Sequence, residues 1–148
     1  MAILYMMIGI PGSGKSTYAK NNIREAKIIS TDAIREELYG DSNIQGDGSR
    51  VFSIAFDRMY NLLNKGENVV FDAMNLKRRD RKNIMKKAPE GTKFIAVFLD
   101  TPLDESVKRN NKRSRNVPED IISDKQKRLQ PPHIEEGFSE IIRIKDGQ

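Results

Sequence analysis

The chain has 148 residues, which fits one domain with a single hydrophobic core. With 37% hydrophobic and 32% charged residues, its composition is typical of a globular protein and argues against intrinsic disorder. The absence of cysteine excludes disulfides and a thiolate metal site, and the lack of any long apolar run excludes a membrane span. We therefore expect a soluble cytoplasmic protein, with a net charge of +5.

Strand and helix patterns alternate along the chain. Residues 3–8 are an unbroken apolar run without the basic leader of a signal peptide, which predicts a strand buried on both faces. A helix should open at residues 14–16 and run to about residue 23. Further strands are predicted over residues 27–30, 68–72, 93–99 and 139–144, and further helices over residues 32–38, 50–64, 77–87, 102–111 and 118–129.

Five strands separated by helices predict one α/β domain over residues 1–148, with an open, mostly parallel sheet and helices on both faces. Ligands of such sheets bind beyond the carboxyl ends of the strands. We therefore expect the residues that follow Ile8, Ser30 and Phe71 to surround one crevice.

The strongest motif is G-x-x-x-x-G-K-S at residues 9–16. Its glycines let several backbone N–H groups wrap a phosphate, and the positive end of the following helix adds to the attraction. The motif predicts a nucleoside triphosphate site with Mg²⁺ on the Ser16 hydroxyl and Lys15 bridging the β- and γ-phosphates. The expected nucleotide-binding residues are Gly9, Pro11, Gly12, Ser13, Gly14, Lys15, Ser16 and Thr17.

Asp32 and Arg35 follow the second predicted strand and share one helix face. Asp32 can accept the proton of an attacking hydroxyl while Arg35 holds an anionic part of the acceptor. The alternative is an ordinary helix start, with Asp32 as a capping residue and Arg35 at the surface. Asp72 ends the third strand, where it can hold Mg²⁺ waters or orient the acceptor, or merely satisfy a turn.

Two basic clusters dominate the second half of the chain. Residues 1–76 carry eight Lys/Arg and nine Asp/Glu, a net −1, whereas residues 77–148 carry eighteen and twelve, a net +6. The clusters are Lys77, Arg78, Arg79, Arg81, Lys82, Lys86 and Lys87, and Lys108, Arg109, Lys112, Arg113 and Arg115. They are typical either of a solvated helix face or of a surface for polyanions.

Other residues point less clearly to function. Phe52, Phe56 and Tyr60 have helical spacing, which favours a core stripe over a platform for base stacking. His133, the single histidine, follows two prolines and is expected in a turn or at the surface.

Four stretches together resemble the kinase domain of the polynucleotide 5′-hydroxyl kinases of bacteriophages and bacteria. They are GIPGSGKST at residues 9–17, TDAIR at 31–35, FDAMNL at 71–76 and VKRNNKR at 107–113. The resemblance covers nearly the whole chain. It implies a three-layer P-loop kinase fold of about five strands, with a helical lid over approximately residues 104–130.

The resemblance also implies roles for individual residues. Asp32 would be the general base for the 5′-hydroxyl, and Arg35 would contact the acceptor's phosphate. Arg113 of the lid would stabilise the transferring phosphoryl group. The remaining acceptor-binding candidates are Asp72, Gln45, Arg50 and Val117, the last as a residue that stacks on the acceptor base.

The implied reaction is transfer of the γ-phosphoryl group of ATP or another nucleoside triphosphate to the 5′-hydroxyl of DNA or RNA. Because no ligase or phosphatase module accompanies these motifs, sealing or 3′-end processing would need another protein. Two alternatives stay open. One is a kinase for a small hydroxylated metabolite or antibiotic, and the other is an ATPase switch without a dedicated acceptor.

Overall fold

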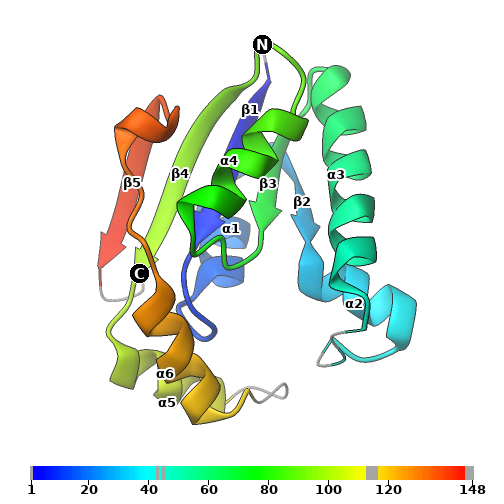
Figure 1. The fold of residues 1–148 in the computed structure, drawn as a ribbon. Helices are drawn as coiled ribbons and strands as arrows, with labels where there is room; N and C mark the ends of the chain where they lie inside the picture. The colour runs from blue at the N-terminus through cyan, green and yellow to red at the C-terminus, as the bar shows by residue number, and fades with distance from the viewer. Residues whose placement is uncertain (1, 43, 45, 113–116, 146–148) are drawn as a thin grey trace.

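A five-stranded parallel sheet forms the middle layer of the molecule (Figure 1). The computed structural model describes residues 2–42, 44, 46–112 and 117–145. The strands are β1 (Ile3–Ile8), β2 (Ala26–Ser30), β3 (Asn68–Asp72), β4 (Lys93–Asp100) and β5 (Glu140–Lys145), in the order β2-β3-β1-β4-β5. All four neighbouring pairs are parallel, so the connections cross over through helices.

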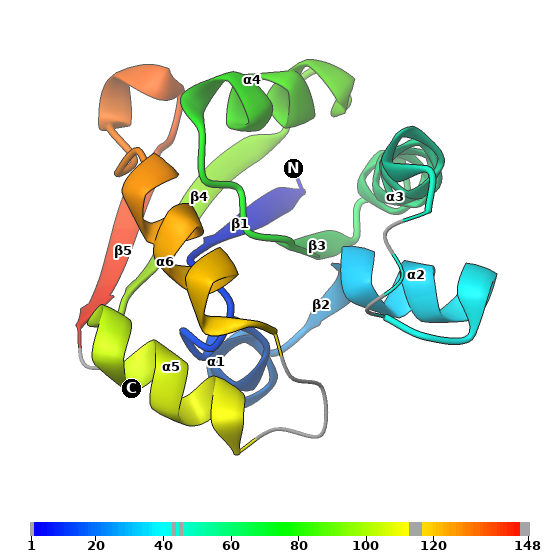
Figure 2. The same cartoon turned by 60° about the horizontal axis from the view of Figure 1, so that its bottom comes forward.

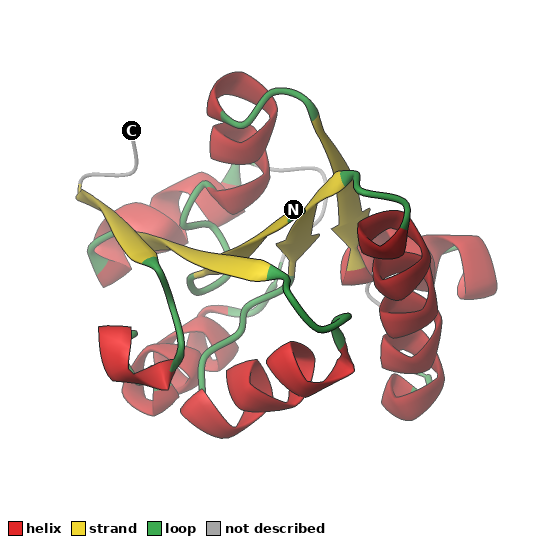
Figure 3. Ribbon diagram, turned by 90° about the horizontal axis from the view of Figure 1, so that it is seen from above, coloured by secondary structure: helices red, strands yellow, loops and turns green. Residues whose placement is uncertain are grey.

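Helices cover both faces of the sheet, which confirms the predicted α/β kinase-type fold. They are α1 (Lys15–Asn22), α2 (Thr31–Tyr39), α3 (Gly48–Asn64), α4 (Arg78–Lys87), α5 (Leu103–Asn111) and α6 (Glu119–Arg128), with a short 3-10 helix, η1 (Ile134–Glu136), before β5. α3 and α4 pack on one face and α1 on the other (Figure 3). α5 and α6 lie beyond the carboxyl ends of the strands (Figure 2). Each predicted boundary agrees with the structure to within two residues.

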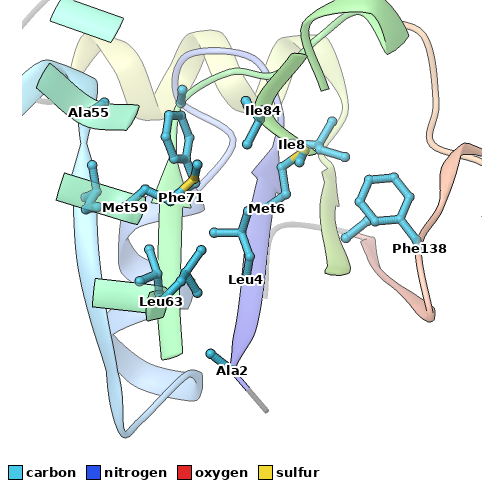
Figure 4. Packing of buried hydrophobic residues seen from close by; sticks show 14 of the residues in the cluster. Ala2, Leu4, Met6, Ile8, Ala55, Met59, Leu63, Phe71, Ile84 and Phe138 are labelled. Atoms are coloured by element: carbon cyan, nitrogen blue, oxygen red, sulfur yellow. The ribbon is translucent and has the colours of Figure 1, made fainter. Parts of the chain in front are cut away.

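The central strand β1 explains why its sequence is apolar throughout. Leu4 and Met6 pack into the larger core cluster with residues of α3 and α4, as Figure 4 shows. Met7 lies in the second cluster with Ala19 of α1. Because successive side chains point to opposite faces, a strand covered on both sides leaves no position for a polar residue. None of the helices in the described ranges is long and apolar enough to cross a membrane.

The turn after β3 is fixed from within the core. Asn75 adopts a left-handed conformation, with φ of 51°, and its side-chain amide donates to the Met7 carbonyl at 2.6 Å. The neighbouring Met74 carbonyl accepts a hydrogen bond from the Gly9 amide at 3.0 Å. The end of β1 and the turn after β3 are thereby held in one arrangement.

Arg81 is a buried structural residue, although the sequence places it in a basic cluster. Its guanidinium is 0% exposed and donates to the carbonyls of Asn75 and Leu76 at 2.8 and 3.1 Å. Two further bonds, of 2.8 and 2.9 Å, join it to the Glu136 carboxylate. The first basic cluster is therefore not a uniform solvated face, because its central arginine points into the core and cannot contact an external polyanion.

Glu136 is held ionised by this pair. Burial raises the pKa of Glu136, but hydrogen bonds from Arg81 and from the His133 amide outweigh it, so the pKa lies below its usual 4.5. Since the folded-state pKa is the lower one, the pair's contribution to stability is complete above about pH 4.5 and is lost as the pH falls through the folded-state pKa.

Replacing Glu136 by Gln should therefore destabilise the protein near neutral pH and flatten its acid sensitivity. Removing one partner of a buried pair leaves the other charge uncompensated, which typically costs about 3 kcal/mol. Urea unfolding at pH 7 and pH 4 measures both effects. The control is Glu135→Gln, since Glu135 is an exposed neighbour in the same short helix. An equal, small loss in both variants would contradict a stabilising role for the pair.

Candidate functional site

The loop between β1 and α1 has the geometry of a phosphate-binding loop. Gly12 and Gly14 have φ of 81° and 98°, values that favour glycine. Gly12 also packs so tightly against α5 that an added Cβ would lie 2.3 Å from the Ser106 carbonyl oxygen. α1 begins directly after Gly14, and its positive end adds to the amides that point toward a bound phosphate.

The reactive side chains of the loop lie at the start of α1. The Lys15 ammonium donates to the Ile10 carbonyl at 3.1 Å, so it lies over the loop. The Ser16 hydroxyl donates to the Asp72 carboxylate, with 2.6 Å between the oxygens. One hydroxyl and one carboxylate fit the way Mg²⁺ is held beside a triphosphate, where phosphate oxygens and waters complete the shell. Among the described residues, this site included, no group of three or more His, Cys, Asp or Glu could hold a metal.

The loop is anchored to the helical layer beyond the strands. The Ser13 carbonyl accepts hydrogen bonds from the Thr101 hydroxyl at 2.8 Å and from the Arg109 guanidinium at 3.2 Å. Arg109 also pairs with Glu105 at 3.2 Å. α5 therefore contacts the phosphate loop directly, and it brings one arginine of the second basic cluster to the nucleotide side of the site.

Asp32 and Arg35 occupy the first turn of α2. The Ser30 hydroxyl caps this helix by accepting from the Ala33 amide, so Asp32 is not the capping residue. Asp32 and Arg35 form an ion pair at 3.3 Å, with the Asp32 side chain 43% exposed and that of Arg35 13% exposed. The Arg35 Nε atom is buried without a hydrogen-bond partner in the described part of the chain. The pair therefore combines a solvent-accessible carboxylate with a guanidinium whose Nε–H group can still donate a hydrogen bond.

These groups line one cavity of about 750 Å³ at the carboxyl ends of β1, β2 and β3. Its wall comprises Pro11, Gly12, Gly14, Lys15, Ser16, Thr17, Thr31, Asp32, Arg35, Phe52, Phe56, Asp72, Ala73, Met74, Asn75, Leu76, Lys77, Arg79, Asp80, Asn83, Ile84, Arg109, Lys125 and Arg128. Most of the predicted nucleotide residues, together with Asp32, Arg35 and Asp72, thus meet around a single space. Gly9 and Ser13 shape the loop from behind, where Ser13 is fully buried.

Besides Gly9 and Ser13, four predicted residues are not placed in the cavity wall. Arg50 is exposed in the first turn of α3. Val117 packs with the small cluster of Ile10, Leu76 and Ile122, and its backbone exchanges two hydrogen bonds, of 2.6 and 3.0 Å, with the Asn110 side chain. Its expected stacking on an acceptor base stays a prediction. Gln45 and Arg113 lie outside the described residues.

Sequence reasoning missed part of the cavity wall. Lys125 and Arg128 of α6 both line the cavity and are three residues apart, a spacing that places them on one helix face. Phe52 and Phe56 also line it, whereas Tyr60 is 44% exposed and lies outside it. Helical spacing alone could have found the basic pair, but it could not separate a cavity wall from a core stripe. His133 is exposed, as expected, at the start of η1.

The fold and this site define a P-loop nucleotide-binding domain of the kinase type. A family model described as an AAA domain matches residues 4–132, and the chain belongs to this family. The resemblance to the kinase domains of polynucleotide kinases is confirmed by solved structures: the chain superposes on a chain of the Pnkp1/Rnl/Hen1 RNA repair complex with a TM-score of 0.78 and 28% identity, covering 87% of this chain and 44% of that one.

The names of the curated relatives specify different acceptors. The chain is 28% identical over 144 residues to an L-seryl-tRNA(Sec) kinase of Methanococcus maripaludis, covering 88% of this chain and 53% of the relative. It is 24% identical over 156 residues to a putative bifunctional polynucleotide kinase/RNA ligase of the Autographa californica nuclear polyhedrosis virus, covering 95% and 21%. The chain thus spans about half the length of the first relative and a fifth of the second. A gluconokinase from Sinorhizobium meliloti, at 20% identity and a TM-score of 0.65, shares the fold.

Replacing Gly12 by Ala should weaken nucleotide binding, because a Cβ has no room against the Ser106 carbonyl and the loop must shift. We expect a loss of ATP affinity of at least about tenfold, or 1.4 kcal/mol, by isothermal titration calorimetry. The matched control is Gly91→Ala, which has a φ of 91° but no atom within 4 Å of the added Cβ. That control should lose stability without losing affinity. Equal ATP affinities in the two variants would show that the contact with α5 does not shape the loop.

Proposed function

We propose that this domain transfers the γ-phosphoryl group of ATP to the 5′-hydroxyl of DNA or RNA, with Mg²⁺. The observation that carries the proposal is the Asp32–Arg35 pair, which lines the same cavity as Lys15 and Ser16 of the phosphate loop. A carboxylate and an arginine that share a space with the triphosphate site supply a base for a hydroxyl and a contact for a phosphate.

Each group has a distinct task in the proposed reaction. Asp32 accepts the proton of the attacking 5′-hydroxyl, and Arg35 binds the phosphate next to it. Lys15 neutralises charge on the donor phosphates, while Ser16 and Asp72 would hold Mg²⁺, which supplies further positive charge there. The chemistry demands little covalent participation by the protein, so the catalytic effect comes from positioning and electrostatics.

Nucleic acid is favoured over a small acceptor by two observations. The cavity carries a cationic rim of Lys77, Arg79, Lys125 and Arg128, which suits a phosphate backbone. The relatives at 24–28% identity named above are a polynucleotide kinase/RNA ligase and a kinase of a charged tRNA, together with a chain of an RNA repair complex. The solved neighbour is one chain of a multi-protein RNA repair complex, which supports a separate repair protein as a partner. The likeness to sugar kinases, at 20% identity, concerns the fold alone.

A direct test offers γ-labelled ATP or GTP together with 5′-hydroxyl DNA, 5′-hydroxyl RNA, seryl-tRNA and a panel of sugars and nucleosides. We expect label on the 5′ ends of oligonucleotides, with acceptor KM rising steeply with salt. Label on a sugar, with no salt dependence, would identify a metabolite kinase. Hydrolysis that no acceptor stimulates would identify an ATPase switch.

Replacing Asp32 by Asn should lower kcat by about 10²- to 10⁴-fold, the usual contribution of a positioned general base, and leave ATP affinity intact. Steady-state kinetics with a 5′-hydroxyl oligonucleotide measures the first quantity, and calorimetry measures the second. Glu36→Gln is the control, because Glu36 is an exposed residue of the same helix outside the cavity wall. Near-normal turnover in Asp32→Asn would remove Asp32 from the mechanism.

The lid arginines can be separated by kinetics. We propose that Arg113 stabilises the transferring phosphoryl group, so Arg113→Ala should lose turnover and retain nucleotide binding. Arg109 lines the cavity and bonds to the phosphate loop, so Arg109→Ala should instead weaken ATP affinity. The ratio of kcat loss to KM change for ATP distinguishes the two. Unchanged turnover in Arg113→Ala would exclude that role.

A further inference from the structure

The acceptor side of the cavity has an aromatic wall. Phe52 and Phe56 are the only aromatic residues among the described residues that line the cavity, and both come from the first half of α3. They are partly buried and rest on the core, so part of each ring faces the open space. Each ring is therefore available on its cavity side.

The two rings are held in place by a third. Phe71 of β3 is fully buried, and its ring stacks with those of Phe56 and Phe52 at centroid distances of 5.9 and 6.3 Å and interplanar angles of 24° and 26°. Phe52 and Phe56 are 5.9 Å apart and tilted by 50°. A ligand ring would thus meet a surface that is already ordered, which reduces the entropy lost on binding.

The neighbouring cavity wall is polar. Asp80 and Asn83 of α4 are three residues apart, a spacing that places them on one face of the helix, and both line the cavity beside Ile84. The space between α3 and α4 therefore has an apolar aromatic surface with a carboxylate and an amide at its margin. A flat heterocycle with hydrogen-bonding edges matches this combination, because its face can cover the phenyl rings while its edge meets the carboxylate and the amide.

We propose that Phe52 and Phe56 form a stacking site for the nucleobase of the acceptor's 5′-terminal nucleotide. The proposal rests on the proposed function and adds the substrate feature that is recognised. The stacking site lies next to α2, because α2 and α3 are in contact and Asp32 and Arg35 line the same cavity as the two rings. Asp32 and Arg35 are thus positioned to receive the hydroxyl and phosphate of a nucleotide whose base lies against α3. This stacking site on α3 is separate from Val117, which does not line the cavity.

Two acceptors test the site: a 5′-hydroxyl oligonucleotide, and the same oligonucleotide with an abasic 5′-terminal sugar. For the unaltered protein we expect the abasic acceptor to have a KM higher by on the order of tenfold, as the loss of one stacked base implies. Phe52→Leu and Phe56→Leu keep an apolar side chain against the core and should raise the KM of the base-bearing acceptor alone. Tyr60→Leu, on the same helix but outside the cavity, should change neither KM.

A binding measurement keeps this inference separate from the reaction. An oligonucleotide with 2-aminopurine at its 5′ end should lose fluorescence on binding to the unaltered protein, and Phe52→Leu should lose less. With the fluorophore at the third position, the two proteins should give equal signals. Phosphorylation with equal KM for both acceptors would overturn the stacking site and leave the proposed function standing. Terminal quenching without phosphorylation would support the stacking site and overturn the proposed function. The absence of both quenching and phosphorylation would overturn both proposals.

Discussion

The site depends on a charge that has no contact with water. The Arg81 guanidinium is 0% exposed, and it is tolerated there only because Glu136 and two backbone carbonyls share its donors. Those carbonyls belong to the turn that follows β3, and the same turn is bonded to the ends of β1 through Asn75 and Met74. Because the phosphate loop starts at the carboxyl end of β1, the salt bridge between α4 and η1 helps to fix the loop.

The donor and acceptor halves of the site are built differently. The donor half is a continuous stretch of chain, in which loop, helix start and reactive side chains are neighbours in the sequence. The proposed acceptor half draws on α2, α3 and α4, which are separate in the sequence and line the same cavity in the fold. A local motif can be retained in many families with many acceptors, so a P-loop kinase is identified far more readily than its substrate.

The same difference explains how much could be predicted from the sequence. Runs of apolar residues indicated the strands to within two residues, although the edge strands β2 and β5 are only partly buried. The fixed spacing of Gly9, Gly14, Lys15 and Ser16 indicated the nucleotide site. Arg81 was beyond such reasoning, because its burial depends on Glu136, 55 residues further along the chain. Phe52 and Phe56 share one helical stripe with Tyr60, yet only the first two line the cavity. That distinction depends on the position of α4 in the fold. Val117 was assigned from a resemblance, and its role stays a prediction, because its hydrogen bonds to Asn110 involve only its backbone.

The strand order also has a consequence for how the protein folds during its synthesis. β1 is made first, but it pairs with β3 and β4, whose residues follow it by more than 60 and about 90 positions. A nascent chain on the ribosome therefore exposes an apolar, unpaired segment until β4, about 90 positions later, has also emerged, and pairing over such separations is slow. The phosphate loop is synthesised early and becomes functional late. Chaperones that shield extended apolar segments should therefore meet this chain before ATP can.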